Sequence, residues 1–534
     1  MKNSFLYQKP LRHLEQNPLE NTCDKNLLKE LISKRSALPF YSVSIAIPWV
    51  GMKHFCGICG ASFPDCGAEL ALYQMLLQMQ HRGQLSAGIT VLKENEPFLL
   101  RTHKDLGLVN NVFHAEHKGK FSSIMQKFSS RKGIGHIRYA TCGADDVEYA
   151  QPFEHFHGLK NRWFSLAFNG NIANYSKIKS ALEEKNYHFV RENDTEAIML
   201  LLSKSLKEKE TILGAFSNLA DILDGAYCLS FMNAEGTLVG ARDPLGLRPL
   251  CYAEKDGKVA FASESIALQS IGFEEIHDLE PGKMIIQEKD SFRIEEFAKS
   301  EKRAHCFFEW VYFAHAASKI EGKIVYEVRY ALGKELAKLE KQSIDKNCVV
   351  VAVPDSSTPS GNGFAEALGI PLREGLIRNR YVGRTFIEAK DRAERVKSKF
   401  SLIKEVFEGK KVFLIEDSIV RGTTLKSLVS FIKKFGSPKE IHVRVSCPPI
   451  LSPCFYGIDM RTKKELIAAE MGADESAIAK ELGVDSLSYQ TIPGLIRALG
   501  LKEKDLCLAC LNGNYPTEAG KENALNDSGT GRKC

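Results

Sequence analysis

A hydrophobic strand, two carboxylates, a short polar loop and a helix follow one another in Val412–Thr424, VFLIEDSIVRGTT. The helix continues with apolar residues three and four positions apart up to Ile432, and Gly436 is placed to end it. This order of elements is typical of an open α/β sheet, in which ligands bind beyond the carboxyl ends of the strands. The segment therefore predicts a parallel-sheet domain with a ligand site after this strand.

The residues after this strand indicate what the ligand is. Free backbone N–H groups at a helix start can hold a phosphate, and Thr423 and Thr424 add hydroxyl donors. Glu416 and Asp417 can hold ribose hydroxyls and a Mg²⁺ ion, which would be shared with substrate phosphates because proteins rarely enclose Mg²⁺ alone. The alternative is an ordinary strand–helix junction with a solvated acidic pair.

Residues 301–475 share this α/β pattern as a whole. Continuous apolar runs, typical of buried parallel strands, alternate with helical segments. Strands are expected at Val349–Val353, Lys411–Ile415 and Glu440–Val445, and helices at Gly363–Leu368 and Leu425–Phe435. The pattern predicts a doubly wound α/β domain.

Residues 56–300 show short strands separated by turns. Strands are expected at Ile134–Tyr139, Ser165–Phe168, Ala226–Met232 and Lys258–Ala262. Helices are expected over Leu72–Met79, where four apolar side chains share a face before Gly83, and over Thr195–Leu206. This part of the chain is predicted to be a β-rich α+β layered domain.

The ends of the chain and its composition limit the remaining possibilities. Residues 1–55 are interpreted as an extension or propeptide, or as the product of a misplaced start codon with Met52 as the true first residue; residues 476–534 are expected to be a helical segment with a polar tail.

No apolar run reaches the roughly 18 residues that a membrane span needs. The net charge of +6 is too small and too dispersed to indicate binding to nucleic acid or membrane. Fourteen cysteines in 534 residues favour reduced thiols, a catalytic cysteine or metal ligands, and hence a cytoplasmic location.

Val412–Thr424 resembles the phosphoribosyl pyrophosphate (PRPP) motif of the type I phosphoribosyltransferases, with Glu416 in place of the usual first aspartate. Val353–Ser357 (VPDSS) is similar to the pyrophosphate loop of that family. Asn379–Ile387 (NRYVGRTFI) is similar to its flexible flap, whose arginines can clamp phosphates, although a solvated arginine-rich loop is the alternative. The resemblance implies Mg²⁺ ligands at Ser356, Glu416 and Asp417. It implies PRPP contacts at Asp355, Ser356, Arg380, Tyr381, Arg384, Glu416, Asp417, Ser418, Arg421, Gly422, Thr423 and Thr424.

A second resemblance begins at Cys56. CGICG, followed by a helix and Gln80–Gly88 (QHRGQLSAG), resembles the start of the class II glutamine amidotransferases, whose αββα domain carries an N-terminal cysteine nucleophile. The α-amine of such a cysteine has a pKa of about 8 and serves as the base for its own thiol, so the residues before Cys56 must be removed. A buried structural thiol is the alternative interpretation of Cys56.

Further motifs occur in the order of that family. Arg138, in GHIRYAT, is implied to bind the α-carboxylate of glutamine, and Asp194 is implied to bind its α-amino group. Asn169 and Gly170, in FNGNI, are implied to form the oxyanion hole. Two more segments match the family in order: Ala241–Leu250 (ARDPLGLRPL) and Ala262–Ser265 (ASES).

With both resemblances taken together, the chain from Cys56 to about Glu518 is similar to the glutamine phosphoribosylpyrophosphate amidotransferase family. Cys59 stands where that family usually has an aromatic residue. The segment CLACLNGNYPTE resembles the C-terminal segment of its iron–sulfur branch. This implies cluster ligands at Cys306, Cys454, Cys507 and Cys510. Four thiolates suit either zinc or a [4Fe–4S] cluster, and the resemblance favours a cluster with a structural role; reduced buried thiols are the remaining alternative.

The family resemblance implies an enzyme that converts PRPP, glutamine and water into 5-phosphoribosylamine, glutamate and pyrophosphate. This is the first step of de novo purine synthesis, and ammonia passes from the first domain to the second through an internal channel. A homotetramer with feedback inhibition by purine nucleotides is expected from the same resemblance. Two alternatives are a class II amidotransferase with a different acceptor and a non-catalytic PRPP-sensing regulator. The regulator would bind PRPP without turnover and would retain the residues before Cys56.

Overall fold

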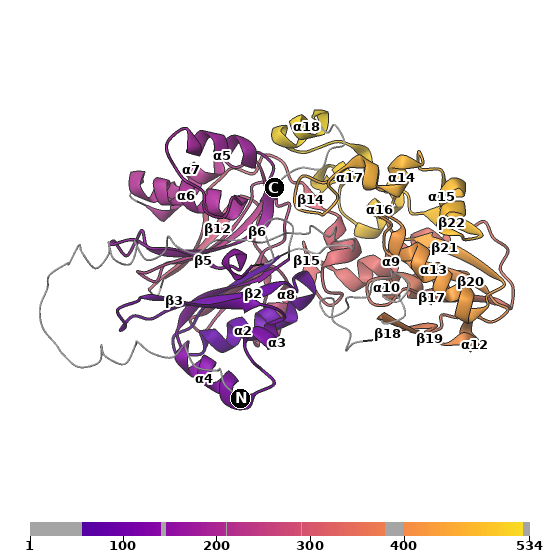
Figure 1. Cartoon of the computed structure of the whole chain (residues 1–534), viewed down its shortest axis with the longest axis horizontal. Coiled ribbons are helices and arrows are strands. Elements are labelled where there is room, and N and C mark those ends of the chain that lie inside the picture. The colour runs from indigo at the N-terminus through magenta and orange to yellow at the C-terminus, as the bar shows by residue number, and fades with distance from the viewer. Residues whose placement is uncertain (1–55, 140–145, 210, 290, 380–398, 527–534) are drawn as a thin grey trace, which may run out of the picture. The chain divides into compact units, whose positions relative to one another are not determined.

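The computed structural model describes residues 56–139, 146–209, 211–289, 291–379 and 399–526. Its first part contains two antiparallel sheets, whose strand orders are β11-β9-β10-β1-β4-β2-β3 and β13-β12-β8-β7-β6-β5 (Figure 1). The strands of the seven-stranded sheet are β1 (Gly57–Ser62), β2 (Ser86–Leu92), β3 (Leu100–Leu106), β4 (Lys132–Arg138), β9 (Cys251–Lys255), β10 (Lys258–Ala262) and β11 (His277–Asp278). Those of the six-stranded sheet are β5 (Phe153–His155), β6 (Phe164–Ile172), β7 (Gly225–Asn233), β8 (Leu238–Arg242), β12 (Lys283–Glu288) and β13 (Ser291–Glu296).

Three apolar cores show that these sheets are stacked between two layers of helices. One core lies between the sheets and includes Ile58, Met232 and Phe261. A second joins the seven-stranded sheet to its helices, and a third joins the six-stranded sheet to its own. The helices are α2 (Ala68–Gln78), α3 (Val109–Val112), α4 (Lys118–Lys127) and α8 (Ser265–Gln269) on the first sheet, and α5 (Tyr175–Glu183), α6 (Asp194–Glu208) and α7 (Ile212–Ala220) on the second. The predicted αββα domain is therefore confirmed.

The second part is built on a parallel sheet with the strand order β17-β20-β21-β22. Its strands are β17 (Cys348–Ala352), β20 (Lys411–Glu416), β21 (Glu440–Val445) and β22 (Ser486–Tyr489), and the helices on its faces include α9 (Val325–Ala337), α10 (Thr358–Leu368), α13 (Thr423–Gly436) and α15 (Glu475–Leu482). Successive residues of a strand point to opposite faces, so Phe413 packs with α9 and α10 whereas Leu414 packs with α13. With helices on both faces, the doubly wound α/β class is confirmed, and β22 lies beyond the predicted boundary at residue 475.

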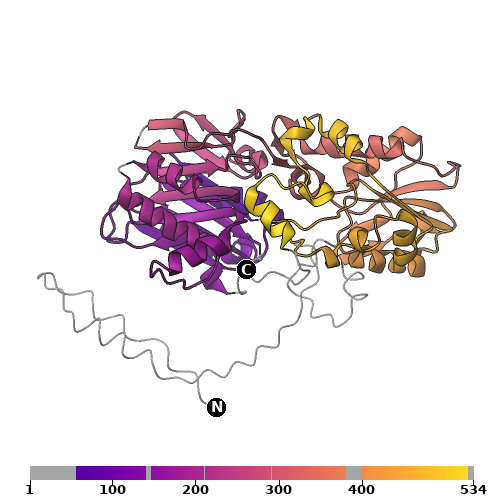
Figure 2. The ribbon, with the colours of Figure 1, turned by 90° about the horizontal axis from the view of Figure 1, so that it is seen from above.

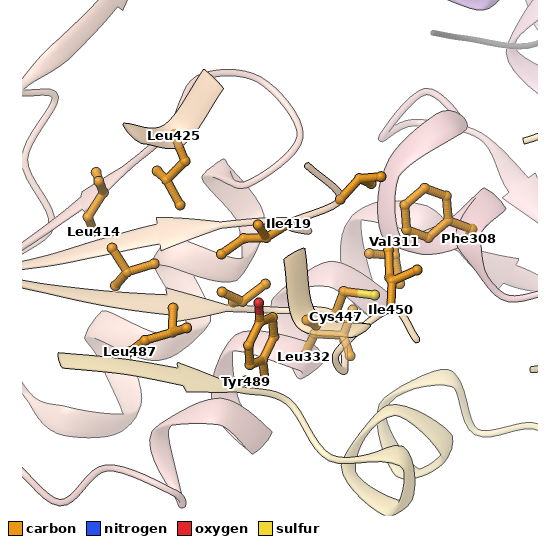
Figure 3. Packing of buried hydrophobic residues seen from close by; sticks show 14 of the residues in the cluster. Phe308, Val311, Leu332, Leu414, Ile419, Leu425, Cys447, Ile450, Leu487 and Tyr489 are labelled. Carbon is orange, nitrogen blue, oxygen red and sulfur yellow. The ribbon is translucent and has the colours of Figure 1, made fainter. Parts of the chain in front are cut away.

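A π-helical turn, η3 (Glu309–Phe313), belongs to the core of this second part. Phe308 and Val311 lie in one cluster with Leu414 and Leu487, as Figure 3 shows. Arg329 of α9 fixes the turn, because its guanidinium donates to the carbonyl oxygens of Trp310 at 2.7 Å and Ala314 at 2.8 Å. The turn is thus held rigidly by the α/β domain.

The remaining elements are short. They are η1 (Gln80–Arg82), η2 (Val147–Tyr149), β14 (His305–Cys306), β15 (Lys319–Ile320), β16 (Lys323–Ile324), β18 (Leu376–Arg378), β19 (Phe400–Leu402), α12 (Lys404–Phe407), η4 (Lys463–Glu465), α14 (Ile467–Glu470), α16 (Ile492–Leu499), η5 (Glu503–Asp505), β23 (Leu506–Cys507), α17 (Ala509–Asn512) and α18 (Glu518–Leu525). The C-terminal α18, yellow in Figure 2, lies against the αββα part, where Asn523 Nδ2 donates to the carbonyl of Ala173 at 2.8 Å. No helix among the described residues is both long enough and apolar enough to cross a bilayer.

The predicted strands and helices occur, with bounds that differ from the prediction by at most five residues. The helix expected at Gly363–Leu368 begins five residues earlier, at Thr358, because Pro359 and small polar residues form a first turn without apolar periodicity. Helix α2 ends at Gln78, so a 3₁₀ turn separates it from Gly83. Gly436, expected to end α13, is its last residue, and Ser437 adopts the left-handed conformation that closes the helix.

Cys59 is a core residue and cannot pair with Cys56. Residues three apart on an extended strand point to opposite faces, and Cys59 lies on β1, three residues after Cys56. Its side chain is fully buried beneath α2, and a Cβ added to Gly135 would lie 2.8 Å from its sulfur. The C-x-x-C spacing at this position is therefore a packing feature.

Candidate active sites

Cys56 lies at the carboxyl end of β4, beside two of the predicted glutamine-binding residues. The pairing of β1 with β4 sets Gly57 opposite Ile137, which brings Cys56 next to Arg138. The sulfur of Cys56 is 3.9 Å from the carbonyl oxygen of Tyr139. Burial raises the pKa of the Cys56 thiol, while Arg138 lowers it and Asp194 raises it. Cys56, Arg138 and Asp194 thus share one electrostatic environment.

Asn169 is joined to the start of β1 through Ser263. Its Nδ2 lies 3.3 Å from Ser263 Oγ, which also accepts the backbone N–H of Ile58 at 3.0 Å. The Oδ1 atom of Asn169 is buried and has no hydrogen-bond partner among the described residues. Ser263 therefore holds the amide of Asn169 beside Ile58, two residues after Cys56.

Gly170 can only be glycine in this fold. A Cβ at this position would lie 1.9 Å from the carbonyl oxygen of Ala226 on β7. The close approach of the two strands aligns the backbone of Gly170 at the edge of the site.

We expect Gly170→Ala to destabilise the αββα domain by about 1–3 kcal/mol, the usual cost of overpacking a close contact. Gly158→Ala is the matched control, because a Cβ there would meet no atom of the described residues within 4 Å. The measurement is the melting temperature of each purified variant. Equal melting temperatures for the two variants would contradict the close packing of β6 on β7.

Asp194 is the first residue of α6 and faces the same site. Its Oδ1 accepts the backbone N–H of Thr195 at 2.9 Å, and Asn193 caps the helix by accepting the N–H of Glu196 at 2.8 Å. Burial raises the pKa of Asp194 to about 6, although backbone hydrogen bonds at Thr195 and Ile172 lower it. A buried carboxylate of this kind is stabilised when an ammonium group binds beside it.

The raised pKa of Asp194, about 6, predicts a pH dependence. Protonation of the Cys56 α-amine, the predicted base, already lowers kcat/KM for glutamine below about pH 8. Below about pH 6 the Asp194 carboxyl is also protonated and cannot take its predicted part in pairing with the α-ammonium of glutamine, so the fall should steepen by a further factor of about ten per pH unit. In Asp194→Asn this additional steepening should disappear at a lower kcat/KM. The measurement is the pH profile of glutamate release between pH 5 and 8, with ammonia-dependent turnover followed in parallel. An unchanged steepening in the variant would assign it to another group.

Sequence reasoning missed a buried ionic group next to Cys56. Arg82 donates through Nε to the carbonyl oxygen of Cys56 at 3.2 Å, and its other nitrogens bond to Glu264 at 2.5 Å and to Glu309 at 2.9 and 3.0 Å. Burial alone would lower the pKa of Arg82, but Glu309 and Glu264 raise it. Arg82 lies in QHRGQLSAG and Glu264 in ASES, two segments whose order in the chain gave the only sequence signal for them.

The second site lies beyond the carboxyl ends of β17 and β20. Ser356 Oγ donates to Asp417 Oδ2 at 2.5 Å, which joins the VPDSS loop to the acidic pair. Asp355 has a φ of 81° and bonds to Arg378 of β18. Ser418 Oγ donates to the other oxygen of Asp417 at 2.6 Å. The loops after the two strands therefore converge on Asp417.

The buried acidic pair has the character of a cation site. Burial raises the pKa of Glu416 well above its usual range, and the neighbouring charge of Asp417 raises it further. Burial also raises the pKa of Asp417, while Ser356, Ser418 and the guanidinium of Arg329 lower it. Two carboxyl groups and a serine hydroxyl are hard oxygen donors of the kind that Mg²⁺ prefers, so the residues fit this ion.

The loop after Asp417 leads into the start of α13. Gly422 has a φ of 71°, and among the described residues no side chain caps the helix that begins at Thr423. Its first N–H groups can therefore bind an anion. Arg421, in contrast, bonds to Glu465 and to the carbonyl oxygen of Asp459 at 3.2 Å. Arg380, Tyr381 and Arg384 lie outside the described residues.

The four predicted ligand cysteines line one small cavity. The parallel bridge of β14 with β23 sets Cys306 opposite Cys507, and Cys454 and Cys510 complete the wall beside Arg248. Burial raises the pKa of the Cys306 thiol to about 12 and raises that of Cys510 well above its usual range. No three His, Cys, Asp or Glu side chains of the described residues converge closely enough to hold a single metal ion.

Comparisons with known proteins identify relatives of the chain. A glutamine amidotransferase domain model matches residues 136–270, and a phosphoribosyl transferase domain model matches residues 327–453. The amidophosphoribosyltransferase of Methanothermobacter thermautotrophicus is 41% identical over 467 residues, covering 86% of this chain and 94% of the relative. That of Bacillus subtilis is 38% identical over 481 residues, covering 89% and 97%. The solved glutamine PRPP amidotransferase of B. subtilis, complexed with ADP and GMP, matches with a TM-score of 0.76 and 36% identity over 87% of this chain and 98% of that one.

Proposed function

The chain belongs to the amidophosphoribosyltransferase family and transfers the amide nitrogen of glutamine to PRPP in purine synthesis, and we propose which of its residues perform each step. The observation that supports the assignment best is the pair of sites in one chain. Cys56 lies with Arg138 and Asp194 at one site, and Asp417 joins the two loops after β17 and β20 at the other.

At the first site, the thiol of Cys56 attacks the amide carbon of glutamine. The α-amine of Cys56, exposed once the preceding residues are removed, takes the thiol proton and passes it to the departing nitrogen. The C–N bond breaks, ammonia leaves, and water then hydrolyses the thioester to glutamate. Arg138 binds the α-carboxylate of glutamine, and Asp194 binds its α-ammonium group.

Asn169 and Gly170 stabilise the negative oxygen of the tetrahedral intermediate. The backbone N–H of Gly170 is one donor, and Asn169 Nδ2 is the other. The amide oxygen and nitrogen of an asparagine are nearly interchangeable in outline. The Ser263 hydroxyl accepts the Ile58 N–H and makes a long, 3.5 Å contact to the Ile58 carbonyl oxygen, and its proton can turn to Asn169 Oδ1 instead. With the amide in that orientation, Nδ2 can donate to the reacting oxygen and the unpartnered Oδ1 gains a donor.

At the second site, ammonia attacks carbon 1 of PRPP, the bond to pyrophosphate breaks, and the new amine loses a proton. The side chains of Ser356, Glu416 and Asp417 would hold Mg²⁺, which neutralises the phosphate charge when bound. The start of α13 at Gly422–Thr424 and the hydroxyl of Ser418 bind the 5-phosphate. Asp355 and the segment with Arg380, Tyr381 and Arg384 complete the contacts to pyrophosphate.

We assign a [4Fe–4S] cluster to Cys306, Cys454, Cys507 and Cys510. Zinc requires all sulfurs at about 2.3 Å from one ion, whereas each cysteine of a cluster binds a different iron, so the sulfurs spread around a larger group. Four thiols that line one cavity could each bind a different iron of such a group. When bound, the cluster would tie β14, β23 and the Cys454 loop together.

We further propose that the enzyme works in the cytoplasm as a homotetramer and is inhibited by purine nucleotides. The B. subtilis structure complexed with ADP and GMP supports nucleotide binding.

The experiment that tests the assignment is the intact mass of anaerobically purified protein, with iron and sulfide analysis and a coupled assay with glutamine or ammonia. A chain that starts at Cys56 and forms phosphoribosylamine from both donors is expected. If every molecule retains residues before Cys56 and uses ammonia alone, the glutaminase assignment is wrong. If neither donor yields product while PRPP binds, the enzyme assignment is wrong and the protein is a PRPP-sensing regulator.

A further inference from the structure

We propose that Glu309 is a positioning residue through which the Cys454–Tyr456 loop, in the wall of the four-cysteine cavity, holds the Cys56 nucleophile in place. This inference rests on the proposed function for the role of Cys56. An unbroken series of contacts joins the Cys454–Tyr456 loop to Cys56.

The series begins at the cavity. Cys454 Sγ accepts the backbone N–H of Tyr456 at 3.4 Å, and the carbonyl oxygen of Tyr456 accepts Nη2 of Arg248. Arg248 itself lines the cavity. Its Nη1 then donates to Glu309 Oε1 at 3.2 Å. The loop is therefore joined to Glu309 through one planar guanidinium.

The series ends at the nucleophile. Both oxygens of Glu309 accept from Arg82, at 2.9 and 3.0 Å, in a two-pronged pair whose geometry is fixed. Arg82 Nε donates to the carbonyl oxygen of Cys56 at 3.2 Å. The side chains of Arg82, Arg248 and Glu309 are each at most 1% exposed. A buried charged group of this kind tolerates little displacement, because each unmet charge is costly.

A second contact joins the same loop to the other side of the glutamine site. Asn171 Nδ2 donates to the carbonyl oxygen of Phe455 at 2.8 Å. Asn171 follows Gly170 directly on β6. The Cys454–Tyr456 loop therefore supports both the nucleophile, through Glu309, and the strand that carries the oxyanion donors.

The position of Glu309 on η3 explains why this carboxylate can act as a fixed point. The turn is part of the α/β core and is held by Arg329, whereas Arg82 and Arg248 both belong to the αββα domain. Glu309 is thus one anchor in the α/β core for two buried guanidinium groups of the αββα domain. Misplacing a reacting atom by about 1 Å can cost about 100-fold in rate, which makes such an anchor consequential for Cys56.

The test uses Glu309→Gln in the full-length holoenzyme, with Glu340→Gln as matched control. Glu340 is also paired through both oxygens with a buried arginine, Arg444, at 2.6 and 2.8 Å, but in the α/β domain away from Cys56. We expect kcat with glutamine to fall about 100-fold in Glu309→Gln, with KM for glutamine and ammonia-dependent turnover retained. The control should keep all three values.

A second readout does not depend on turnover. Iodoacetamide labelling is followed by peptide mass spectrometry, with the exposed Cys66 as internal standard. The ratio of Cys56 to Cys66 labelling should change in Glu309→Gln and in Arg248→Lys, because lysine cannot reach Glu309 and Tyr456 at once. Iron content should stay constant in both variants. An unchanged ratio and kcat in either variant would overturn the proposal, and equal effects in Glu340→Gln would reduce Glu309 to a stabilising residue. Wild-type protein without glutamine-dependent product would instead overturn the proposed function, whatever the labelling ratio.

Discussion

Glutamine-dependent synthesis of phosphoribosylamine will be lost in Cys56→Ala, while synthesis from ammonia will persist. Removing the nucleophile from a hydrolase that acts through a covalent intermediate lowers turnover by roughly 10⁴- to 10⁶-fold. Ammonia needs no thiol, since it attacks carbon 1 of PRPP at the site around Asp417. The measurement is pyrophosphate release with saturating glutamine or with ammonium chloride at alkaline pH, on variant and wild type that both start at residue 56.

Cys59→Ala is the matched control for this substitution. Cys59 lies on the same strand and is fully buried, but its sulfur packs against Gly135 and α2 instead of facing Arg138. We expect it to lower the melting temperature and to retain the use of glutamine. Parallel loss of both donors in Cys56→Ala would mean that Cys56 is structural, and retention of glutamine use would place the nucleophile elsewhere.

The elements of this fold that the sequence predicts best are those whose pattern and environment agree. Glu440–Val445 alternates polar with apolar residues and is buried from Ile441 onward, and β21 has the predicted bounds to the residue. Lys258–Ala262 is likewise recovered as β10. The start of α10 was missed because its first turn, TPSG, packs through close backbone approach: a Cβ on Gly333 of α9 would lie 1.9 Å from the carbonyl oxygen of Ser360. A turn that packs through its backbone in this way shows no apolar periodicity in the sequence.

The candidate sites divide in the same way. Residues that act through their own chemistry, such as Cys56 and Asp417, stand in motifs with a recognisable order. Residues that position other side chains do not stand in such motifs. Arg82 and Glu309 are 227 positions apart, and in the sequence each looks like an ordinary surface charge. Only the packing of η3 against the αββα domain reveals that both are buried. The convergence of the four cysteines likewise depends on the pairing of β14 with β23. Each of these strands has only two residues, which is too short for a sequence pattern to predict the pairing.

Asp417→Asn will strongly lower turnover with both nitrogen donors and leave the fold nearly intact. Asp417 is the point where the loops after β17 and β20 meet, through Ser356 and Ser418. A carboxylate that holds Mg²⁺ and substrate in a transition state of high charge is worth about 10²- to 10³-fold in turnover, so kcat/KM for PRPP should fall by that factor with glutamine and with ammonia alike. The measurement is initial rate against PRPP at fixed Mg²⁺, with each donor.

The stability of that variant follows from the sign of the pKa shift. Burial raises the pKa of Asp417, so the protein without its ligands already disfavours the charge that the ligands require. A neutral amide of the same shape costs the unliganded protein little, and the melting temperature without PRPP should stay near that of wild type. The upward shift that Mg²⁺ and PRPP give to the wild type should vanish, because stabilisation by a ligand depends on its affinity. Asp485→Asn is the control: Asp485 accepts the N–H of Ile441 at 2.7 Å at the amino end of β21, away from both loops, and this variant should retain the ligand-induced shift. A variant at Asp417 that unfolds without ligands, or that still melts higher with PRPP, would contradict the assignment of this carboxylate to the cation site.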